Sequence, residues 1–159
     1  MKWIYGRQDW KTLERGLENC YLLTNGLGGF SSLTMTGAVA RNDHSVFMSC
    51  TKAPNHRINM IHRMKEELDI GESKYVLSTQ EFADGTKEEG YRYLTEFSFE
   101  ILPSWRYLTS GVEIEKEIVM AQGSNQIAVN YHMKNRGQGE AVLCVTPFFQ
   151  FEPKGEDLK

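Results

Sequence analysis

The sequence predicts an all-β fold, an antiparallel sandwich or barrel preceded by a short N-terminal helix. Short segments in which apolar and polar residues alternate recur about every ten residues between Cys20 and Phe151, which is typical of about nine strands. Gly, Asn and Asp separate these segments and favour tight turns. Aromatic residues make up 11% of the chain and supply enough core material to argue against disorder.

A helix is predicted near the N-terminus. Asp9 is a suitable N-cap, and Trp10, Leu13 and Leu17 follow at near-helical spacing. Gly16 weakens the last turn because glycine is a poor helix former. The helix is therefore expected to be short.

The first half of the chain then changes to strand patterns. The predicted strands cover residues 20–24, 33–40, 45–51, 58–64 and 74–79. The polar turn at 41–43 separates two of them, and Asp84–Gly85 gives a strong turn signal after the last.

The second half alternates more regularly. Predicted strands cover residues 97–101, 105–107, 112–118 and 127–133, with turns at Ser110–Gly111, 123–125 and 135–137. Glu113, Glu115 and Glu117 share one face of their strand, which we expect to be solvated. Residues 141–151 are almost continuously apolar, and we expect them to form a central strand buried on both faces.

Length and charge limit the classes of function. The 159 residues suit one domain spanning 1–159, and a net charge of −3 argues against a nucleic-acid partner. No apolar run is long enough for a membrane span or a signal peptide, so a cytoplasmic location without a membrane partner is expected. Three widely spaced cysteines predict reduced, mostly buried thiols. The ending FEPKGEDLK follows a strand abruptly, so the chain is expected to be part of a longer protein.

The most distinctive motif is Thr24-Asn25-Gly26-Leu27-Gly28-Gly29-Phe30. Its glycines permit positive φ and close approach of backbones, which suits a structural turn or a turn that also shapes a binding surface. A phosphate cradle of the kind found before a helix is disfavoured, because a strand-forming sequence follows. The turn and the binding-surface interpretations both remain open.

Other constellations point to no catalytic chemistry. Adjacent Asp, His and Ser at 43–45 cannot converge as a triad, and Cys50, His56 and His62 lack zinc-ligand spacing. We expect no metal and no cofactor. Trp105 and Tyr107 share one strand face and belong either to the core or to a surface that stacks on sugar rings.

These segments together resemble the N-terminal domain of bacterial and archaeal-type glycogen debranching enzymes (amylo-α-1,6-glucosidases). The matching blocks are 21–32, 41–47, 90–94 with Phe97, Pro103, Trp105 and Tyr107 after them, and 112–116 continuing to Pro147 and Phe148. The sequence departs from the family at three positions. Tyr21 replaces a Trp, Asp43 replaces a Tyr, and Ser45 replaces a Gly.

The resemblance implies a galactose-mutarotase-like sandwich that precedes an (α/α)6 catalytic barrel. That barrel would carry the acids that cleave α-1,6 linkages, so no catalytic residue is expected in this chain. The expected partners are an α-glucan (glycogen or a maltooligosaccharide) and the catalytic domain, in cis or in trans. The residues expected to bind carbohydrate or form the domain interface are Thr24, Asn25, Gly26, Gly28, Gly29, Arg41, His44, Trp105 and Tyr107.

Two other function classes remain open. The chain could be a purely structural module whose apolar face is an obligate interface, without affinity for sugar. It could also be a stand-alone enzyme, which would require turnover of maltodextrin or isomaltose by this chain alone.

Overall fold

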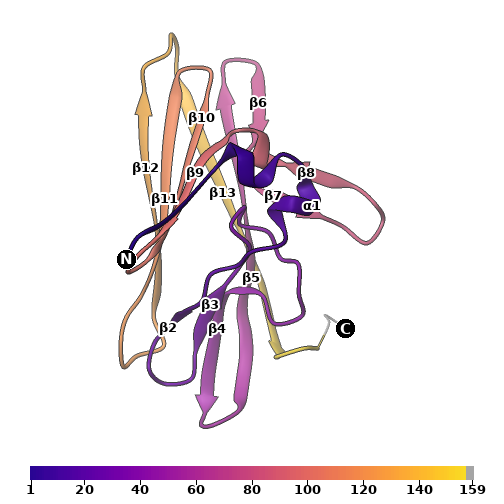
Figure 1. Cartoon of the computed structure of the whole chain (residues 1–159), viewed down its shortest axis with the longest axis vertical. Helices are drawn as coiled ribbons and strands as arrows, with labels where there is room; N and C mark the ends of the chain where they lie inside the picture. The colour runs from indigo at the N-terminus through magenta and orange to yellow at the C-terminus, as the bar shows by residue number, and fades with distance from the viewer. Residues whose placement is uncertain (157–159) are drawn as a thin grey trace.

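The computed structural model describes residues 1–156 and shows two large antiparallel sheets packed face to face, with a separate two-stranded sheet of residues 79–81 and 87–89, as Figure 1 illustrates. The elements in chain order are β1 (Trp3–Gly6), the 3-10 helix η1 (Arg7–Trp10), α1 (Leu13–Gly16), β2 (Leu23–Thr24), β3 (Phe30–Ser32), β4 (Ser45–Lys52), β5 (His56–Ile70), β6 (Ser73–Val76), β7 (Thr79–Glu81), β8 (Lys87–Glu89), the 3-10 helix η2 (Gly90–Arg92), β9 (Leu94–Phe99), β10 (Pro103–Thr109), β11 (Val112–Met120), β12 (Ile127–Asn135) and β13 (Ala141–Pro153). The predicted all-β antiparallel sandwich is confirmed, and neither sheet closes into a barrel.

The first sheet has the strand order β1-β9-β10-β11-β12. Regular alternation sets its register, and β11 presents a strictly alternating pattern of buried and half-buried residues. The predicted Ser110–Gly111 turn joins β10 to β11, with positive φ values of 47° and 78° that suit a tight hairpin. The glutamates of β11 lie on its more exposed face, as expected.

The second sheet has the order β13-β5-β4-β3-β2 and is organised by β5. This strand has 15 residues and pairs with β13 along most of its length. The opposite edge of β5 pairs with β4 over its first part and with β6 over its last part. The predicted strand 58–64 was too short, because the charged run 65–69 hides the alternation that continues to Ile70.

The core lies between the sheets. Trp105 and Ile118 from the first sheet are fully buried, as are Val46 and Leu68 from the second. The Trp105 indole N–H donates to the Met35 carbonyl at 3.0 Å, which ties the first sheet to the segment that follows β3. Such fully buried large side chains supply most of the hydrophobic stabilisation of a domain this size.

The N-terminal segment differs in detail from the prediction. Asp9 does not cap the α-helix: its carboxylate accepts the Gly6 N–H at 2.8 Å within η1. Thr12 is the N-cap of α1 instead, and its hydroxyl accepts the Arg15 N–H at 3.3 Å. β1, which sequence alternation did not predict, pairs with β9.

The predicted strand 33–40 is wrong, because this segment forms turns. Thr34 uses its carbonyl to accept the Gly37 N–H and its hydroxyl to accept the Ala38 N–H. Gly37 adopts a φ of 81°, which a strand does not contain. Local side-chain hydrogen bonds thus replace the sheet ladder here.

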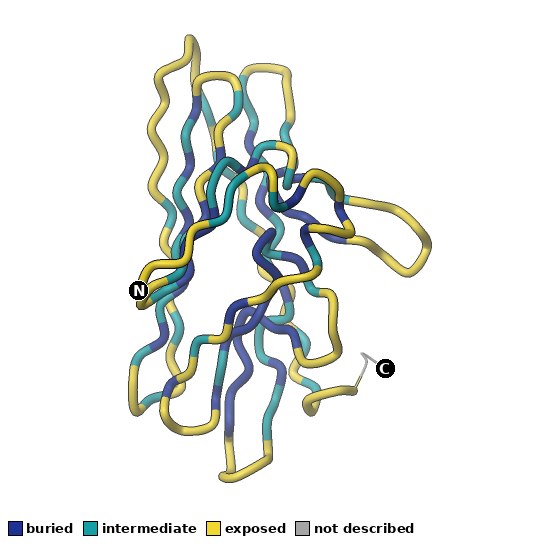
Figure 2. The backbone as a smooth tube through the Cα atoms, in the orientation of Figure 1, coloured by how far each residue is buried: buried dark blue, intermediate teal, exposed yellow. Residues whose placement is uncertain are grey.

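The expectation that 141–151 is a central strand buried on both faces is also wrong. Among the described residues β13 pairs only with β5, so it is an edge strand. Phe148, Phe149 and Phe151 are 42%, 54% and 60% exposed. An apolar segment indicates which side chains tolerate burial, but they become buried only where another strand or loop covers them. Figure 2 shows comparable exposure along β12, the edge strand of the other sheet.

The three cysteines are free, as expected, but only Cys50 is buried, while Cys20 and Cys144 are exposed. Within residues 1–156, no helix has the length and apolarity that a membrane crossing requires.

Candidate functional site

The glycine loop is organised by the buried side chain of Asn25. Its Oδ1 accepts the N–H groups of Leu27 at 2.9 Å and Gly29 at 3.1 Å. Its Nδ2 donates to the Ser124 carbonyl at 3.0 Å and to Asn125 Oδ1 at 3.1 Å. One buried amide therefore folds the loop and ties it to the turn between β11 and β12. All of its hydrogen-bonding positions are used, so Asn25 acts on a ligand only by shaping the loop.

The glycines of this loop are required by its geometry. Gly28 has a φ of 89°, in the region that favours glycine. A Cβ at Gly29 would lie 2.7 Å from Asn25 Nδ2 and 3.0 Å from the Met48 carbonyl oxygen. The loop therefore packs tightly on β4 while its outer side stays open.

The outer side forms what we term the glycine-loop cavity, of about 580 Å³. Thr24, Gly26, Gly28 and Gly29 line it, so the structure brings four of the residues predicted from sequence together. Asp43, Arg57 and Lys154 come from distant segments and complete the wall. The residues flanking the loop also line it: Cys20, Tyr21, Leu22, Phe30 and Ser32.

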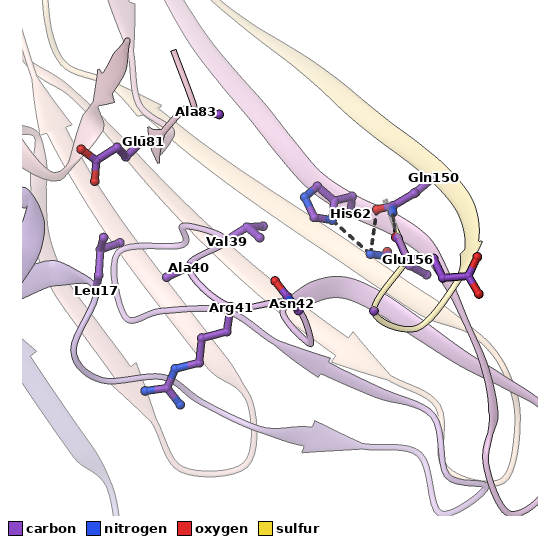
Figure 3. Close-up of a pocket in the computed structure, with 12 residues that line it drawn as sticks. Leu17, Val39, Ala40, Arg41, Asn42, His62, Glu81, Ala83, Gln150 and Glu156 are labelled. Atoms are coloured by element: carbon purple, nitrogen blue, oxygen red, sulfur yellow. Dashed lines mark hydrogen bonds between the residues drawn. The ribbon is translucent and has the colours of Figure 1, made fainter. Parts of the chain in front are cut away.

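A second cavity, which we term the polar cavity, has about 500 Å³ and is shown in Figure 3. It is lined by Leu17, Val39, Ala40, Arg41, Asn42, Asn59, His62, Glu81, Ala83, Gln150, Gly155 and Glu156. Arg41 contributes to this wall, but its side chain points away from His62 and Gln150 (Figure 3).

A hydrogen-bond network orients the polar side chains of this cavity. Asn59 Nδ2 donates to Gln150 Oε1 and is bonded to His62 Nδ1, both at 3.0 Å. Asn59 Oδ1 accepts a hydrogen bond from the Ser45 hydroxyl at 2.8 Å, which fixes the orientation of the buried amide. Gln150 in turn donates to the Glu156 carbonyl at 2.8 Å. The cavity thus presents amide and imidazole edges in fixed positions.

The two cavities are neighbours. Asp43 and Lys154 line the glycine-loop cavity, while the adjoining Asn42 and Gly155 line the polar cavity. The turn 41–43 and the segment 154–156 therefore separate them. Two motifs that the sequence places far apart therefore line neighbouring cavities.

His44 is buried at the end of the turn 41–43, which separates the two cavities. It is 2% exposed, its Nδ1 accepts the Ala40 N–H at 3.0 Å, and its backbone N–H donates to the Arg41 carbonyl at 2.9 Å. Nε2 has no hydrogen-bond partner among the described residues. Burial lowers the pKa of His44 despite the opposing charge of Asp43, so the folded state holds a neutral imidazole.

We expect this imidazole to make stability depend on pH. A His in an unfolded chain titrates near pH 6.5, so the full contribution is present above that pH and is lost as the pH falls towards the depressed folded pKa. Between pH 7.5 and 5.5 the wild type should lose up to about 1 kcal/mol more unfolding free energy than His44→Asn. Urea unfolding at both pH values measures this, with the exposed His132→Asn as control. Equal losses in wild type and His44→Asn would contradict the assignment.

Trp105 and Tyr107 lie in the core rather than at either cavity. They are 0% and 4% exposed, which confirms the core interpretation and leaves no ring face open to a sugar. Burial, together with the nearby Glu66 carboxylate, raises the pKa of Tyr107 well above its ordinary value.

The sequence analysis missed a charged cluster between the sheets. Lys116 of β11 forms an ion pair with Glu66 of β5, and Tyr131 donates its hydroxyl to the same carboxylate at 2.8 Å. Both charged side chains are at most 5% exposed. The ammonium also lies 5.3 Å from the Trp105 ring centroid. The sequence does contain a signal for this cluster. Lys116 lies two residues from Ile114 and from Ile118, so it shares the strand face that points to the core.

Comparison with known proteins identifies a family. The family model "Glycogen debranching enzyme N terminal" matches residues 19–159, nearly the whole chain. The resemblance drawn from the motif blocks is thereby confirmed. Comparisons with curated proteins and with solved structures gave no match.

Proposed function

Because the chain belongs to the family of glycogen debranching enzyme N-terminal domains, we propose that it is a non-catalytic domain that binds α-glucan in the polar cavity. A separate (α/α)6 catalytic domain, in cis or in trans, would cleave the branch points beside it, in the cytoplasm. The observation that carries the proposal is the fixed array of amide and imidazole groups in a cavity of small-molecule size.

The chemistry of the polar cavity suits a polyhydroxylated ligand. Asn42, His62 and Gln150 offer donors and acceptors for hydroxyl groups. Leu17 and Val39 add apolar area on which the C–H face of a sugar ring can rest. The adjoining glycine loop extends the surface, so a longer glucan would pass Thr24 and the open backbone of Gly26 and Gly28.

Glu81, which lines this cavity, is not expected to act as a glycosidase acid. Glu81 is engaged in an ion pair with Lys87 at 3.2 Å. We therefore expect no release of reducing sugar from maltodextrin or isomaltose by the isolated chain. Turnover that disappears in Glu81→Gln would instead establish a stand-alone enzyme.

A structural role is the second candidate, and the exposed aromatic residues of β13 favour it. The rings of Phe149 and Phe151 lie parallel, with centroids 5.7 Å apart, and both are more than half exposed. Exposed apolar clusters of this kind often mark interfaces. In this case the domain would pack on the catalytic domain without binding sugar.

Substitutions at the polar cavity separate the two candidates. His62→Ala should weaken maltoheptaose binding about tenfold, since it removes a positioned polar contact. Arg41→Ala should weaken it only about twofold, because that side chain points away from the polar network. The exposed Arg92 of η2, which pairs with Glu89, provides the control Arg92→Ala. Isothermal titration calorimetry measures all three, and an unchanged affinity in His62→Ala would contradict glucan binding at this cavity.

A further inference from the structure

The glycine-loop cavity carries more positive charge than a neutral glucan requires. We propose that it binds a phosphate monoester, as found in a phosphorylated sugar, between the side chains of Arg57 and Lys154. This cavity adjoins the polar cavity, and only the end of a longer glucan would reach it, so the inference does not depend on glucan binding in the polar cavity.

Arg57 presents a fixed guanidinium group to the cavity. Its Nε donates to the Gly28 carbonyl at 2.7 Å, which anchors the group against the loop and leaves the two terminal nitrogens available. Among residues 1–156, no carboxylate lies within ion-pair distance of Arg57. A half-buried, anchored and unpaired guanidinium favours an oxyanion ligand, which it can bind in a bidentate manner.

Lys154 supplies the second cation. Its backbone N–H donates to the Arg57 carbonyl at 2.9 Å, so the two residues are held side by side. Its ammonium lies 5.5 Å from the Phe30 ring centroid and 4.0 Å from Asp43 Oδ2. That separation from Asp43 is too long for a strong contact, so the ammonium remains available to a ligand.

The cavity therefore combines two cations with one carboxylate. Asp43 partly neutralises the site and would compete with a bound phosphate for Lys154. The backbone of the loop contributes little, because the N–H groups of Leu27 and Gly29 already donate to Asn25. This arrangement differs from a phosphate cradle at a helix N-terminus, which the sequence disfavours: here side chains bind the anion.

The test is a calorimetric titration of the full chain with inorganic phosphate and with glucose 6-phosphate at low ionic strength. Arg57→Gln and Lys154→Gln should each weaken binding about tenfold through loss of a charge-assisted hydrogen bond. Asp43→Asn should tighten it about threefold, because it removes the competing carboxylate. The exposed Lys134 of β12 gives the control Lys134→Gln, which should leave the affinity unchanged. Binding should also weaken as salt rises.

The proposal predicts that Lys154→Gln weakens phosphate binding and that Asp43→Asn tightens it, so the direction of each change tests it. Tighter binding of glucose 6-phosphate than of inorganic phosphate would show that the sugar also contacts the cavity, and equal affinities would show recognition of the phosphate alone. Either result supports the proposal. Lack of binding, an unchanged affinity in Lys154→Gln, or an equal loss in Lys134→Gln would overturn it. Phosphate binding without maltoheptaose binding would uphold this site and refute the glucan proposal.

Discussion

Replacing Lys116 with methionine is expected to destabilise the domain by about 3–5 kcal/mol, the range observed when one partner of a buried ion pair is removed. Among the described residues, the substitution leaves the Tyr131 hydroxyl as the one remaining hydrogen-bond donor to the buried Glu66 carboxylate. Burial and this neighbouring carboxylate raise the pKa of Tyr131 well above its ordinary value, so the phenol stays protonated and neutral and does not replace the positive charge of Lys116. Urea unfolding at pH 7 measures the loss.

The double variant Lys116→Met with Glu66→Gln separates charge from packing. It removes both charges, so it should recover most of the stability that the single change loses. The control is Lys65→Met, since Lys65 pairs with Glu67 at 3.4 Å on a more exposed part of β5. This control should cost less than about 1 kcal/mol. Additive losses in the double variant would contradict a coupled buried pair.

Asn25→Ala is expected to cost about 3 kcal/mol, because it leaves several buried polar groups without partners. The Leu27 and Gly29 N–H groups lose their acceptor, and the Ser124 carbonyl loses its donor. Thermal or urea unfolding measures the change. Asn42→Ala, at an exposed position of the neighbouring turn, should cost under about 0.5 kcal/mol. A loss in Asn25→Ala as small as this control would show that the loop does not depend on that amide.

Sequence alternation predicted four of the five strands of the first sheet, β9 to β12, and missed only the N-terminal edge strand β1. β11 is the clearest example, because its period of two is uninterrupted from Val112 to Met120. The same reasoning failed for β13, where an apolar run indicates which side chains would tolerate burial but not whether a neighbouring strand covers them. It also failed at 33–40, where Thr34 makes local hydrogen bonds that a hydrophobic pattern does not report.

The candidate site was only partly predictable for a topological reason. The glycines of the loop stand out because their motif is local. Asn59 and Gln150 are 91 positions apart and meet only because β13 pairs with β5. Arg57 and Lys154 are brought together by the same pairing, where β5 begins and β13 ends. Motif spacing along a chain cannot reveal residues that sheet register alone brings together.

The most direct test of glucan binding follows the backbone amide signals of the isotopically labelled chain by NMR during titration with maltoheptaose. The account predicts a well-dispersed spectrum with saturable shifts at Asn42, His62 and Gln150, weaker shifts along the glycine loop, and no change at the Trp105 indole in the core. A dispersed spectrum in which these signals do not move at millimolar sugar would contradict glucan binding by this domain and would leave the structural role as the better explanation.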